Sequence, residues 1–510
     1  MRFILILFSC GLLATASCQP TDPPPPIREM RGAWMATVLN IDYPRIATPD
    51  PDTLRMQYIG RLDSLRALGI NAVFVQVRST ADAFYPSRLA PWSRWLTGEQ
   101  GLAPKDNFDP LPFLIQAAHQ RGMEFHAWLN PYRVSINLDT AALSPDNIFY
   151  RHRDWVVQYG NRYYLDPGIP AAADHVIAVI DELLTNYPVD GLHFDDYFYP
   201  YRIAGQAFPD SLSYLVDSRG FASVDDWRRD NVNRFIQRVG RLVAERRPAV
   251  HFGVSPFGVW RNQALDPTGS ATATGATSYD DLFADIRLWA DRHWVDYVAP
   301  QIYFSTELSV ARYTTILDWW TLNHYDLPIY SGMGFYKIGN NADSTWFQPD
   351  HIIHQLALNR MRPAIQGQIY YNTSSLLRNP LGASGLLKAA QRPPALWPAR
   401  TLRPSTLAPT PRMRRAKFKS DRGVRLRWQY KRRVPENDLP WYFAIYRFEG
   451  NAPAYRDRPG SLLHVTPLGA GGRNHEYYDA TAVEGKTYRY QVVPMNRYHL
   501  EGVLGEVVVD

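Results

Sequence analysis

The sequence predicts a (β/α)8 TIM barrel followed by a small all-β sandwich. Between residues 30 and 390, eight short apolar runs alternate with amphipathic helical stretches, as in a parallel sheet covered by helices. After a proline-rich segment at 394–412, shorter runs of alternating polarity follow, separated by turn residues. A doubly wound open sheet is the main alternative. It would bring a glycine-rich phosphate-binding turn after a strand, and we find none in the sequence.

The chain begins with a secretion signal at residues 1–18, which read MRFILILFSCGLLATASC. One positive charge precedes an apolar run that is too short to span a bilayer. The end of this segment resembles a bacterial lipobox, in which Cys18 is acylated and becomes the mature N-terminus. We therefore expect a lipid anchor in a bacterial cell envelope, on the periplasmic face of the outer membrane. A plain signal peptide cut near Ala16 is the alternative, and the proline-rich residues 19–27 form a stiff spacer.

The barrel is expected over residues 28–393. Its eight strands are placed at 31–38, 71–78, 123–129, 189–195, 250–256, 295–302, 328–333 and 364–371. Helices are expected at 54–68, 110–121 and 171–186, which end at glycines or before a proline. Ser223 and Ser278 each open a further helix, with carboxylates in the first turn where the helix dipole favours anions.

A sandwich that resembles a fibronectin type III domain is expected over residues 413–510, after the proline-rich linker at 394–412. Its strands include 423–430, 441–448 and 487–493. Trp428 is expected inside, and Tyr488 and Tyr490 on a late strand. The domain is interpreted as a spacer or docking module without catalytic residues.

Composition excludes several kinds of chemistry. The two cysteines lie at positions 10 and 18, so the body of the chain has no disulfide, zinc–thiolate site or cysteine nucleophile. The net charge of +6 is local, because residues 412–433 carry eleven Lys or Arg and one acid. That pattern does not indicate a nucleic-acid partner. We find no His, Asp and Glu spacing typical of a metal site, and we expect no metal and no cofactor.

Barrel enzymes place their active site where strands end and loops begin. The residues at these positions are mainly amides, guanidinium groups and aromatic rings, which suit a neutral polyhydroxy ligand such as a glycan. The predicted substrate-binding residues are Trp34, Gln76, Arg78, His126, Asn130, Tyr132, Arg133, His193, Tyr197, Trp260, Arg261, Gln301, Tyr303, Gln368, Tyr371 and Asn372. His126 has a second interpretation, as a hydrogen-bonded histidine of the barrel core.

The segment 190–197, DGLHFDDY, is the sharpest feature. Two adjacent carboxylates after an apolar strand are hard to explain by packing, because burying a charge is costly. Strand alternation gives His193, Asp195 and Tyr197 one face, so Asp195 should point into the barrel mouth. Asp196 reaches the site only if the strand ends or bulges there. The alternative is that one of the pair caps a helix or pairs with Arg78 or Arg133.

Seven motifs in order resemble the bacterial glycosyl hydrolase-like 10 family. They are RGAWMATVLNIDYP (31–44), EFHAWLNPYR (124–133), YLDPG (164–168), DGLHFDDYFYP (190–200), FGVSPFGVWRN (252–262), VDYVAPQIYF (295–304) and GQIYYNTSSLL (367–377). The resemblance spans residues 28–390 and implies a barrel glycoside hydrolase of the cell envelope. A characterised member of the family cleaves peptidoglycan glycan strands stripped of stem peptides, so the resemblance implies a glycan substrate, with peptidoglycan as the first candidate.

The resemblance also narrows the mechanism. Chitinase-type barrels end strand four with a catalytic Glu where this sequence has Tyr197, so that pattern does not carry over. Barrels with an adjacent Asp-Asp pair fit better, and in them the acetamide of the substrate is the nucleophile. By that analogy Asp195 polarises the acetamide and Asp196 is the acid. Pairing with a loop acid such as Asp82 or Asp166 stays open, as do another polysaccharide substrate and a non-catalytic glycan-binding barrel.

Overall fold

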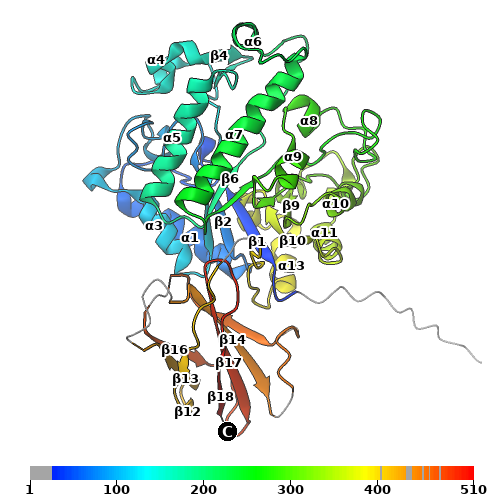
Figure 1. The fold of residues 1–510 in the computed structure, drawn as a ribbon. Helices are drawn as coiled ribbons and strands as arrows, with labels where there is room; N and C mark the ends of the chain where they lie inside the picture. Colours follow the sequence, from blue (N-terminus) through cyan, green and yellow to red (C-terminus); the bar gives the residue numbers. More distant parts are fainter. Residues whose placement is uncertain are drawn as a thin grey trace, which may run out of the picture.

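The computed structural model describes residues 26–402, 405–431, 439–450, 453–458, 460–469 and 472–509, and it confirms the predicted fold class (Figure 1). Eight parallel strands close into a barrel in the order β1-β10-β9-β8-β7-β6-β3-β2. They are β1 (Met30–Met35), β2 (Ala72–Arg78), β3 (Glu124–Leu129), β6 (Gly191–Phe194), β7 (His251–Val254), β8 (Tyr297–Val298), β9 (Ile329–Met333) and β10 (Ile365–Tyr370). Each lies within one of the eight predicted runs or at most one residue outside it.

The strands form where they do because both of their faces are covered. In β2, for example, all seven residues of AVFVQVR are buried. One face of the barrel packs on the surrounding helices and the other fills the interior, so polar alternation is absent. A hairpin of β4 (Val156–Tyr159) and β5 (Arg162–Leu165) lies outside this sheet.

Helices surround the barrel. The longer ones are α1 (Pro51–Ala67), α3 (Pro110–His119), α5 (Pro170–Asn186), α7 (Val224–Arg246), α10 (Tyr313–Leu322), α11 (His351–Arg360) and α13 (Ala383–Ala390). The shorter ones are α2 (Arg94–Thr97), α4 (Ile148–Arg151), α6 (Ser211–Val216), α8 (Ser278–Asp281), α9 (Ile286–Asp291) and α12 (Thr373–Arg378). Ser223 caps α7 as predicted, through a bond from the Asp226 amide. The cap of α8 is Thr277 rather than Ser278, and that helix is a single turn.

The C-terminal region consists of two antiparallel sheets that hang below the barrel in Figure 1. One contains β11 (Arg412–Met413), β12 (Lys417–Lys419), β13 (Gly423–Gln429) and β16 (Asn474–Asp479), and the other contains β14 (Tyr442–Glu449), β15 (Leu462–Val465), β17 (Tyr488–Met495) and β18 (Gly505–Val509). Side chains of both sheets share one core, in which Trp428 packs on Phe443 with ring centroids 5.1 Å apart.

This region closes the amino-terminal end of the barrel. The indole of Trp397 donates to the Asn71 carbonyl at 2.9 Å and stacks on His499. The Leu468 amide donates to the carbonyl of His119, and Arg28 pairs with Glu501. A hydrophobic cluster runs from the barrel interior into the second sheet without interruption. The linker and the C-terminal region therefore cover the amino-terminal end, and the carboxyl end remains available for a site.

One glycine of the strand-four motif is required by the barrel interior. A Cβ on Gly191 would fall against the imidazole of His126, 2.5 Å from its Cε1. We expect Gly191→Ala to lower the free energy of unfolding by about 1–3 kcal/mol, because the packed interior cannot give way. Urea denaturation checks this, with Gly60→Ala in α1 as the control, since no atom beyond the neighbouring backbone of its own helix lies within 4 Å of that Cβ position. The control is expected to stabilise by about 0.5–1 kcal/mol. Equal unfolding midpoints for the two variants would contradict this packing argument.

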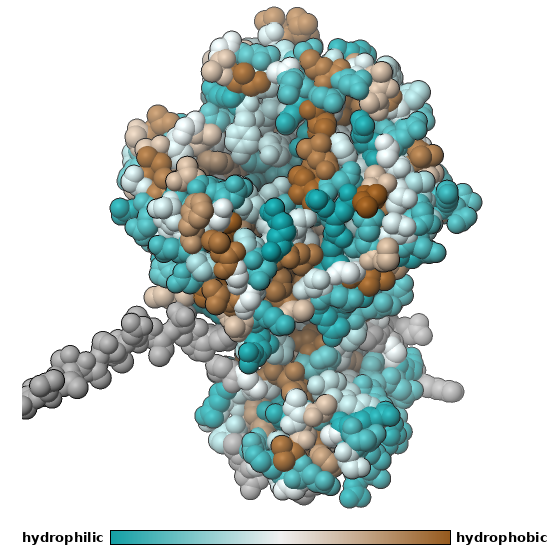
Figure 2. Space-filling model, turned by 180° about the vertical axis from the view of Figure 1, so that it is seen from behind, coloured by the Kyte–Doolittle hydropathy of each residue, from teal (hydrophilic) through white to brown (hydrophobic). Residues whose placement is uncertain are grey.

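The side of the molecule seen in Figure 2 is mostly hydrophilic, with hydrophobic side chains in small separate groups. Within the residues that the structure describes, no helix is long and apolar enough to cross a membrane. The predicted lipidation residue Cys18 and the signal at 1–18 lie outside those residues.

Candidate active site

A cavity of about 290 Å³ opens at the carboxyl end of the barrel strands. Its walls combine aromatic rings, amides, one guanidinium group and one carboxylate. The lining residues are Trp34, Val38, Gln76, Trp128, Arg133, Asp195, Tyr197, Ser255, Gln301, Tyr303, Tyr336 and Tyr371. Eight of the predicted site residues are among them: Trp34, Gln76, Arg133, Asp195, Tyr197, Gln301, Tyr303 and Tyr371. Ring faces and fixed polar groups in one concave site are what a sugar ligand requires.

Asp195 follows the last residue of β6 and faces this cavity. Its Oδ2 accepts a bond of 3.1 Å from the Asn130 amide, and its Oδ1 one of 3.2 Å from Gln301. The backbone amide of Asp196 donates to the same Oδ1 at 3.0 Å. Three neutral donors therefore hold the carboxylate in one orientation without cancelling its charge, as a carboxylate that acts on a substrate requires.

Asp196 lies behind Asp195 and is 2% exposed. β6 ends at Phe194, so Asp196 lies beyond the strand, and the alternation of strand side chains does not fix the direction of its carboxyl group. The Tyr201 hydroxyl donates to Oδ2, while Oδ1 has no hydrogen-bond partner. Burial, together with the adjacent charge of Asp195, raises the pKa of Asp196 well above the ordinary value of a carboxyl. The two carboxyl groups therefore differ: Asp195 faces the cavity among three donors, whereas the surroundings of Asp196 favour its protonated form.

A network of amides supports Asp195. Gln76 donates to the Asn130 Oδ1 at 2.6 Å, and Arg133 donates to the same oxygen at 3.1 Å. Gln76 in turn accepts from the backbone amides of Thr37 and Val38, which fixes which end of its side chain is the donor. Asn130 consequently presents its NH2 group to Asp195. The predicted residue Asn130 therefore does not line the cavity but orients the carboxylate that does.

Aromatic rings form a further part of the cavity wall. The rings of Tyr303 and Tyr371 stack at 5.9 Å, and Trp34 meets both edge-on at 6.5 and 6.3 Å. Tyr336, in the 3-10 helix η5 (Phe335–Lys337), packs perpendicular to Tyr303 and Tyr371. Four lining residues were not among the predicted site residues: Val38, Trp128, Ser255 and Tyr336. Val38 and Tyr336 lie in short 3-10 helices after their strands, where strand alternation predicts no direction.

The two loop acids considered as partners for the Asp pair, Asp82 and Asp166, hold turns and loops in place instead. Asp82 accepts from the backbone amides of Ser79 and Thr80 and closes a turn. Asp166 accepts from the amide of Gly168 and the hydroxyl of Ser213. Neither lines the cavity, where Asp195 is the one carboxylate among the residues described. Across the described ranges of the chain, no group of three or more His, Cys, Asp or Glu residues is arranged to hold a metal ion.

Two predicted site residues, Arg78 and Gln368, point away from the cavity. A register shift between Gln76 and Arg78 reverses the parity of β2. Arg78 is fully buried outside the barrel, where Tyr85 and Glu182 act on its charge. Gln368 is also fully buried, because Ile369 and Tyr371 take the inward positions of that segment.

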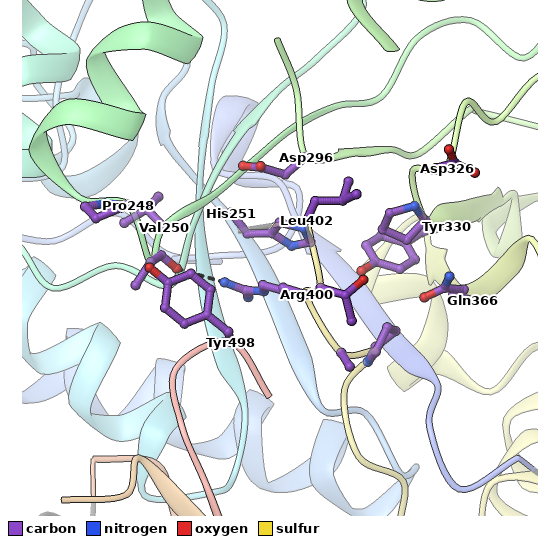
Figure 3. Close-up of a pocket in the computed structure, with 15 residues that line it drawn as sticks. Pro248, Val250, His251, Asp296, Asp326, Tyr330, Gln366, Arg400, Leu402 and Tyr498 are labelled. Carbon is purple, nitrogen blue, oxygen red and sulfur yellow. Dashed lines mark hydrogen bonds between the residues drawn. The ribbon is translucent and has the colours of Figure 1, made fainter. Parts of the chain in front are cut away.

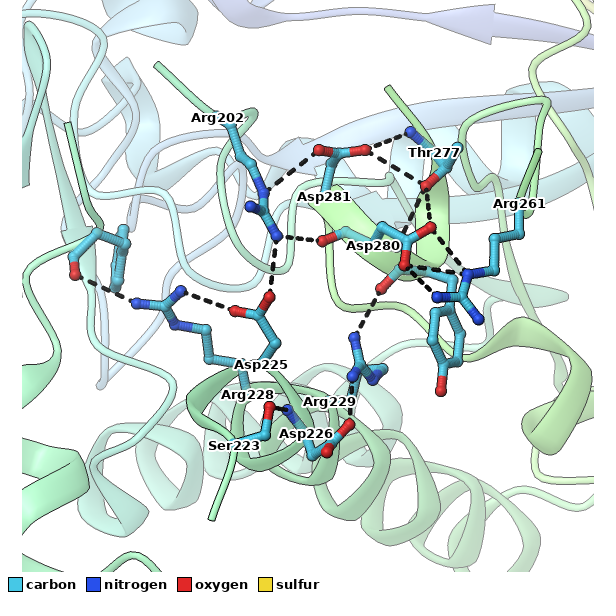
Figure 4. Close-up of polar contacts among 12 residues, drawn as sticks. Arg202, Ser223, Asp225, Asp226, Arg228, Arg229, Arg261, Thr277, Asp280 and Asp281 are labelled. Carbon is cyan, nitrogen blue, oxygen red and sulfur yellow. Dashed lines mark hydrogen bonds and ion pairs between the residues drawn. The ribbon is translucent and has the colours of Figure 1, made fainter. Parts of the chain in front are cut away.

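Four further predicted residues lie beside the barrel rather than in its mouth. Tyr132 packs on Phe235 of α7, and Trp260 stacks on Trp319 of α10 at 5.6 Å. Asn372 caps α12 through the Ser375 amide. Arg261 binds Asp266 and Asp280, within a cluster of charges that joins the start of α7 to α8 (Figure 4). These residues follow their strands in loops, where strand parity no longer predicts direction.

The two predicted histidines lie on the barrel axis. His193 is fully buried directly beneath the cavity, where its Nε2 accepts from the Trp34 indole at 3.0 Å. His126 lies deeper, bonded to Glu124 and Tyr297, as its alternative interpretation as a core histidine predicted. Neither lines the cavity.

A closed (β/α)8 barrel, with Asp195 and aromatic rings lining a cavity at the carboxyl ends of its strands, is an arrangement that barrel enzymes use for their active sites. Residues 29–348 match the model of the glycosyl hydrolase-like 10 family. The chain belongs to that family and is a glycoside hydrolase.

Curated relatives agree with this assignment. The chain is 41% identical over 485 residues to glycosyl hydrolase YngK of Bacillus subtilis (strain 168), which covers 93% of this chain and 92% of that protein. It is 38% identical over 408 residues to glycosyl hydrolase DigH of Escherichia coli (strain K12), and the match covers 73% of this chain and 91% of that protein. Among solved structures, the glycoside hydrolase domain of PgaB (BpsB) from Bordetella bronchiseptica is similar at a TM-score of 0.46 and 14% identity. That match covers 71% of this chain and 99% of the PgaB domain.

Proposed function

We propose that the chain hydrolyses glycosidic bonds in the glycan strands of peptidoglycan, or in a related N-acetylated glycan. The observation that carries this proposal is that Asp195 is the one carboxylate among the described lining residues. An ordinary glycosidase needs a second carboxyl group on the other side of the bond, roughly 5–10 Å away. A substrate that supplies its own acetamide removes the need for a carboxylate nucleophile on the far side of the bond, and peptidoglycan consists of N-acetylated sugars.

In this mechanism Asp195 and Asp196 have different catalytic roles. Asp195, held by Asn130 and Gln301, orients and polarises the acetamide as its oxygen attacks the anomeric carbon. Asp196 is the acid of the pair, because its surroundings favour the protonated form and its Oδ1 has no hydrogen-bond partner. Its side chain must turn from behind Asp195 into the cavity to protonate the leaving oxygen. Water then opens the cyclic intermediate and returns the proton. The aromatic wall stacks on sugar rings and fixes the bond over the pair.

A digestion tests the substrate. The mature chain is incubated with peptidoglycan glycan strands that carry stem peptides and with strands that have been stripped of them, and products are identified by mass spectrometry. Soluble muro-oligosaccharides are expected, and release from stripped strands alone places the enzyme late in wall turnover. No product from either substrate, together with turnover of another polysaccharide in a panel, contradicts the peptidoglycan proposal.

The N-terminal signal supports a lipid anchor at Cys18, on the periplasmic face of the outer membrane. When the full chain is expressed in a Gram-negative bacterium, we expect it to incorporate labelled palmitate and to fractionate with membranes. Cys18→Ala is expected to lose both properties. Cys10→Ala, a matched change within the signal, should retain them, and equal labelling of the two variants would rule the anchor out.

A further inference from the structure

A continuous series of hydrogen bonds runs along the barrel axis beneath the cavity. The Trp34 indole nitrogen lies 3.0 Å from His193 Nε2, and His193 Nδ1 lies 2.9 Å from the Tyr297 hydroxyl. That hydroxyl lies 3.3 Å from His126 Nδ1, and His126 Nε2 lies 3.1 Å from Glu124 Oε2. All five side chains are nearly or fully buried, so water does not compete for these groups. We call Trp34, His193, Tyr297, His126 and Glu124 the axial relay.

The chemistry of its two ends sets the direction of every bond in the relay. An indole N–H can only donate, so His193 Nε2 must accept and His193 carries its proton on Nδ1. That proton points to the Tyr297 oxygen, which leaves the Tyr297 hydroxyl to donate to His126 Nδ1. His126 then carries its proton on Nε2 and donates to Glu124, and a carboxylate can only accept. One arrangement of protons therefore satisfies all four bonds.

The carboxylate end is held from below by the linker and the C-terminal region. Arg400 Nη2 lies 2.6 Å from Glu124 Oε1, and His499 Nε2 lies 2.8 Å from the same oxygen. Arg400 enters beneath the barrel floor between His251 and Tyr498 and also donates to the Ala249 carbonyl (Figure 3). These contacts hold the pKa of Glu124 well below its usual range, although burial opposes them. Arg400 and His499 therefore favour the carboxylate form of Glu124, which accepts hydrogen bonds.

We infer that the axial relay positions Trp34 in the sugar cavity, and that the C-terminal region sets its polarity through Glu124. The sugar-binding part of this inference rests on the proposed function, whereas the relay itself does not. The residues below Trp34 are positioning residues, because none of them lines the cavity. Loss of the relay would weaken the hydrogen bond that holds the indole beside Tyr303 and Tyr371. Ser255 Oγ, which lies outside the relay, is 3.0 Å from the same nitrogen of His193.

The indole signal of Trp34 tests the relay without any glycan. In the full chain labelled with 15N-tryptophan, Trp34→Phe removes one indole cross-peak and so assigns it. Tyr297→Phe deletes one oxygen from the middle of the relay, and we expect the Trp34 indole proton to move upfield or broaden as its bond to His193 weakens. Tyr330→Phe is the matched control, since its ring packs 5.1 Å from that of Tyr297 but lies outside the relay. Identical Trp34 signals in both variants would overturn the inference.

A second pair of variants tests the polarity from the barrel floor. Glu124→Gln offers His126 an amide donor in place of an acceptor, and we expect the same change at Trp34. Glu29→Gln is its control, because Glu29 is a buried carboxylate that pairs instead with Arg31 and Arg360. In kinetics on glycan, Tyr297→Phe should raise KM several-fold with a smaller change in kcat. If the chain does not cleave glycan, the proposed function fails, but the chemical shift of the Trp34 indole still tests whether the relay positions it. Failure of the function and failure of the relay are therefore distinguishable.

Discussion

Asp195→Asn is expected to lower kcat/KM on glycan by about a hundredfold to ten-thousandfold, the typical effect of removing a group that acts on the transition state. The amide is nearly isosteric, but it carries no charge to polarise an acetamide. Its NH2 group would also face one of the two amide donors, Asn130 or Gln301, that now bind the carboxylate. Steady-state kinetics with soluble glycan fragments measure the loss, and unchanged thermal unfolding would separate it from misfolding.

Asp225→Asn is a suitable control for that variant. It is the same chemical change near the start of α7, where the side chain is 39% exposed and pairs with arginines outside the cavity. Its activity should stay within about twofold of the parent, since surface substitutions of this kind have small effects. An Asp195→Asn enzyme that retains a tenth or more of the parent activity would remove Asp195 from the mechanism.

Asp196→Asn is expected to inactivate the enzyme and at the same time to stabilise it at neutral pH. The folded-state pKa of Asp196 is raised by burial and by Asp195 above the unfolded value of about 3.9. Between those two values the folded state binds more protons than the unfolded state, so stability falls as pH rises through that window. An asparagine is neutral at every pH and avoids this cost, but it has no proton to give.

Thermal unfolding of parent and Asp196→Asn at several pH values measures this effect. The difference in Tm should be smallest near pH 4 and should grow as pH rises, with the variant the more stable. Activity of the parent should fall at high pH as Asp196 loses its proton, because the protonated form is the acid. A variant that is less stable than the parent at pH 8, or that retains activity, would contradict the assignment of Asp196 as the neutral acid.

The barrel could be predicted because strands that are covered on both faces have continuous apolar sequences. Strand alternation also predicted that Asp195 faces the barrel mouth, since β6 is regular up to Phe194. It failed at Arg78, where a bulge reverses the parity, and at Gln368, where the inward positions belong to Ile369 and Tyr371. A bulge depends on how two strands pair, and a single strand does not carry that information.

Other features depend on residues that are far apart in the chain. Glu124 and His499 are separated by 375 positions, yet they meet beneath the barrel. Tyr336 enters the cavity from a 3-10 helix that no periodicity announces. The sequence identified the polar residue types of the site, but tertiary packing decided which of them face the cavity and which serve the core.

The dependence on an acetamide tests the central claim most directly. Glycan strands of equal length are prepared with their N-acetyl groups intact and with those groups removed, and initial rates of cleavage are compared for the same enzyme preparation. Substrate-assisted catalysis predicts cleavage of the acetylated strands and none of the de-acetylated ones, with both still binding. Equal cleavage of the two would contradict the account, and it would require a carboxylate nucleophile in addition to Asp195 and Asp196.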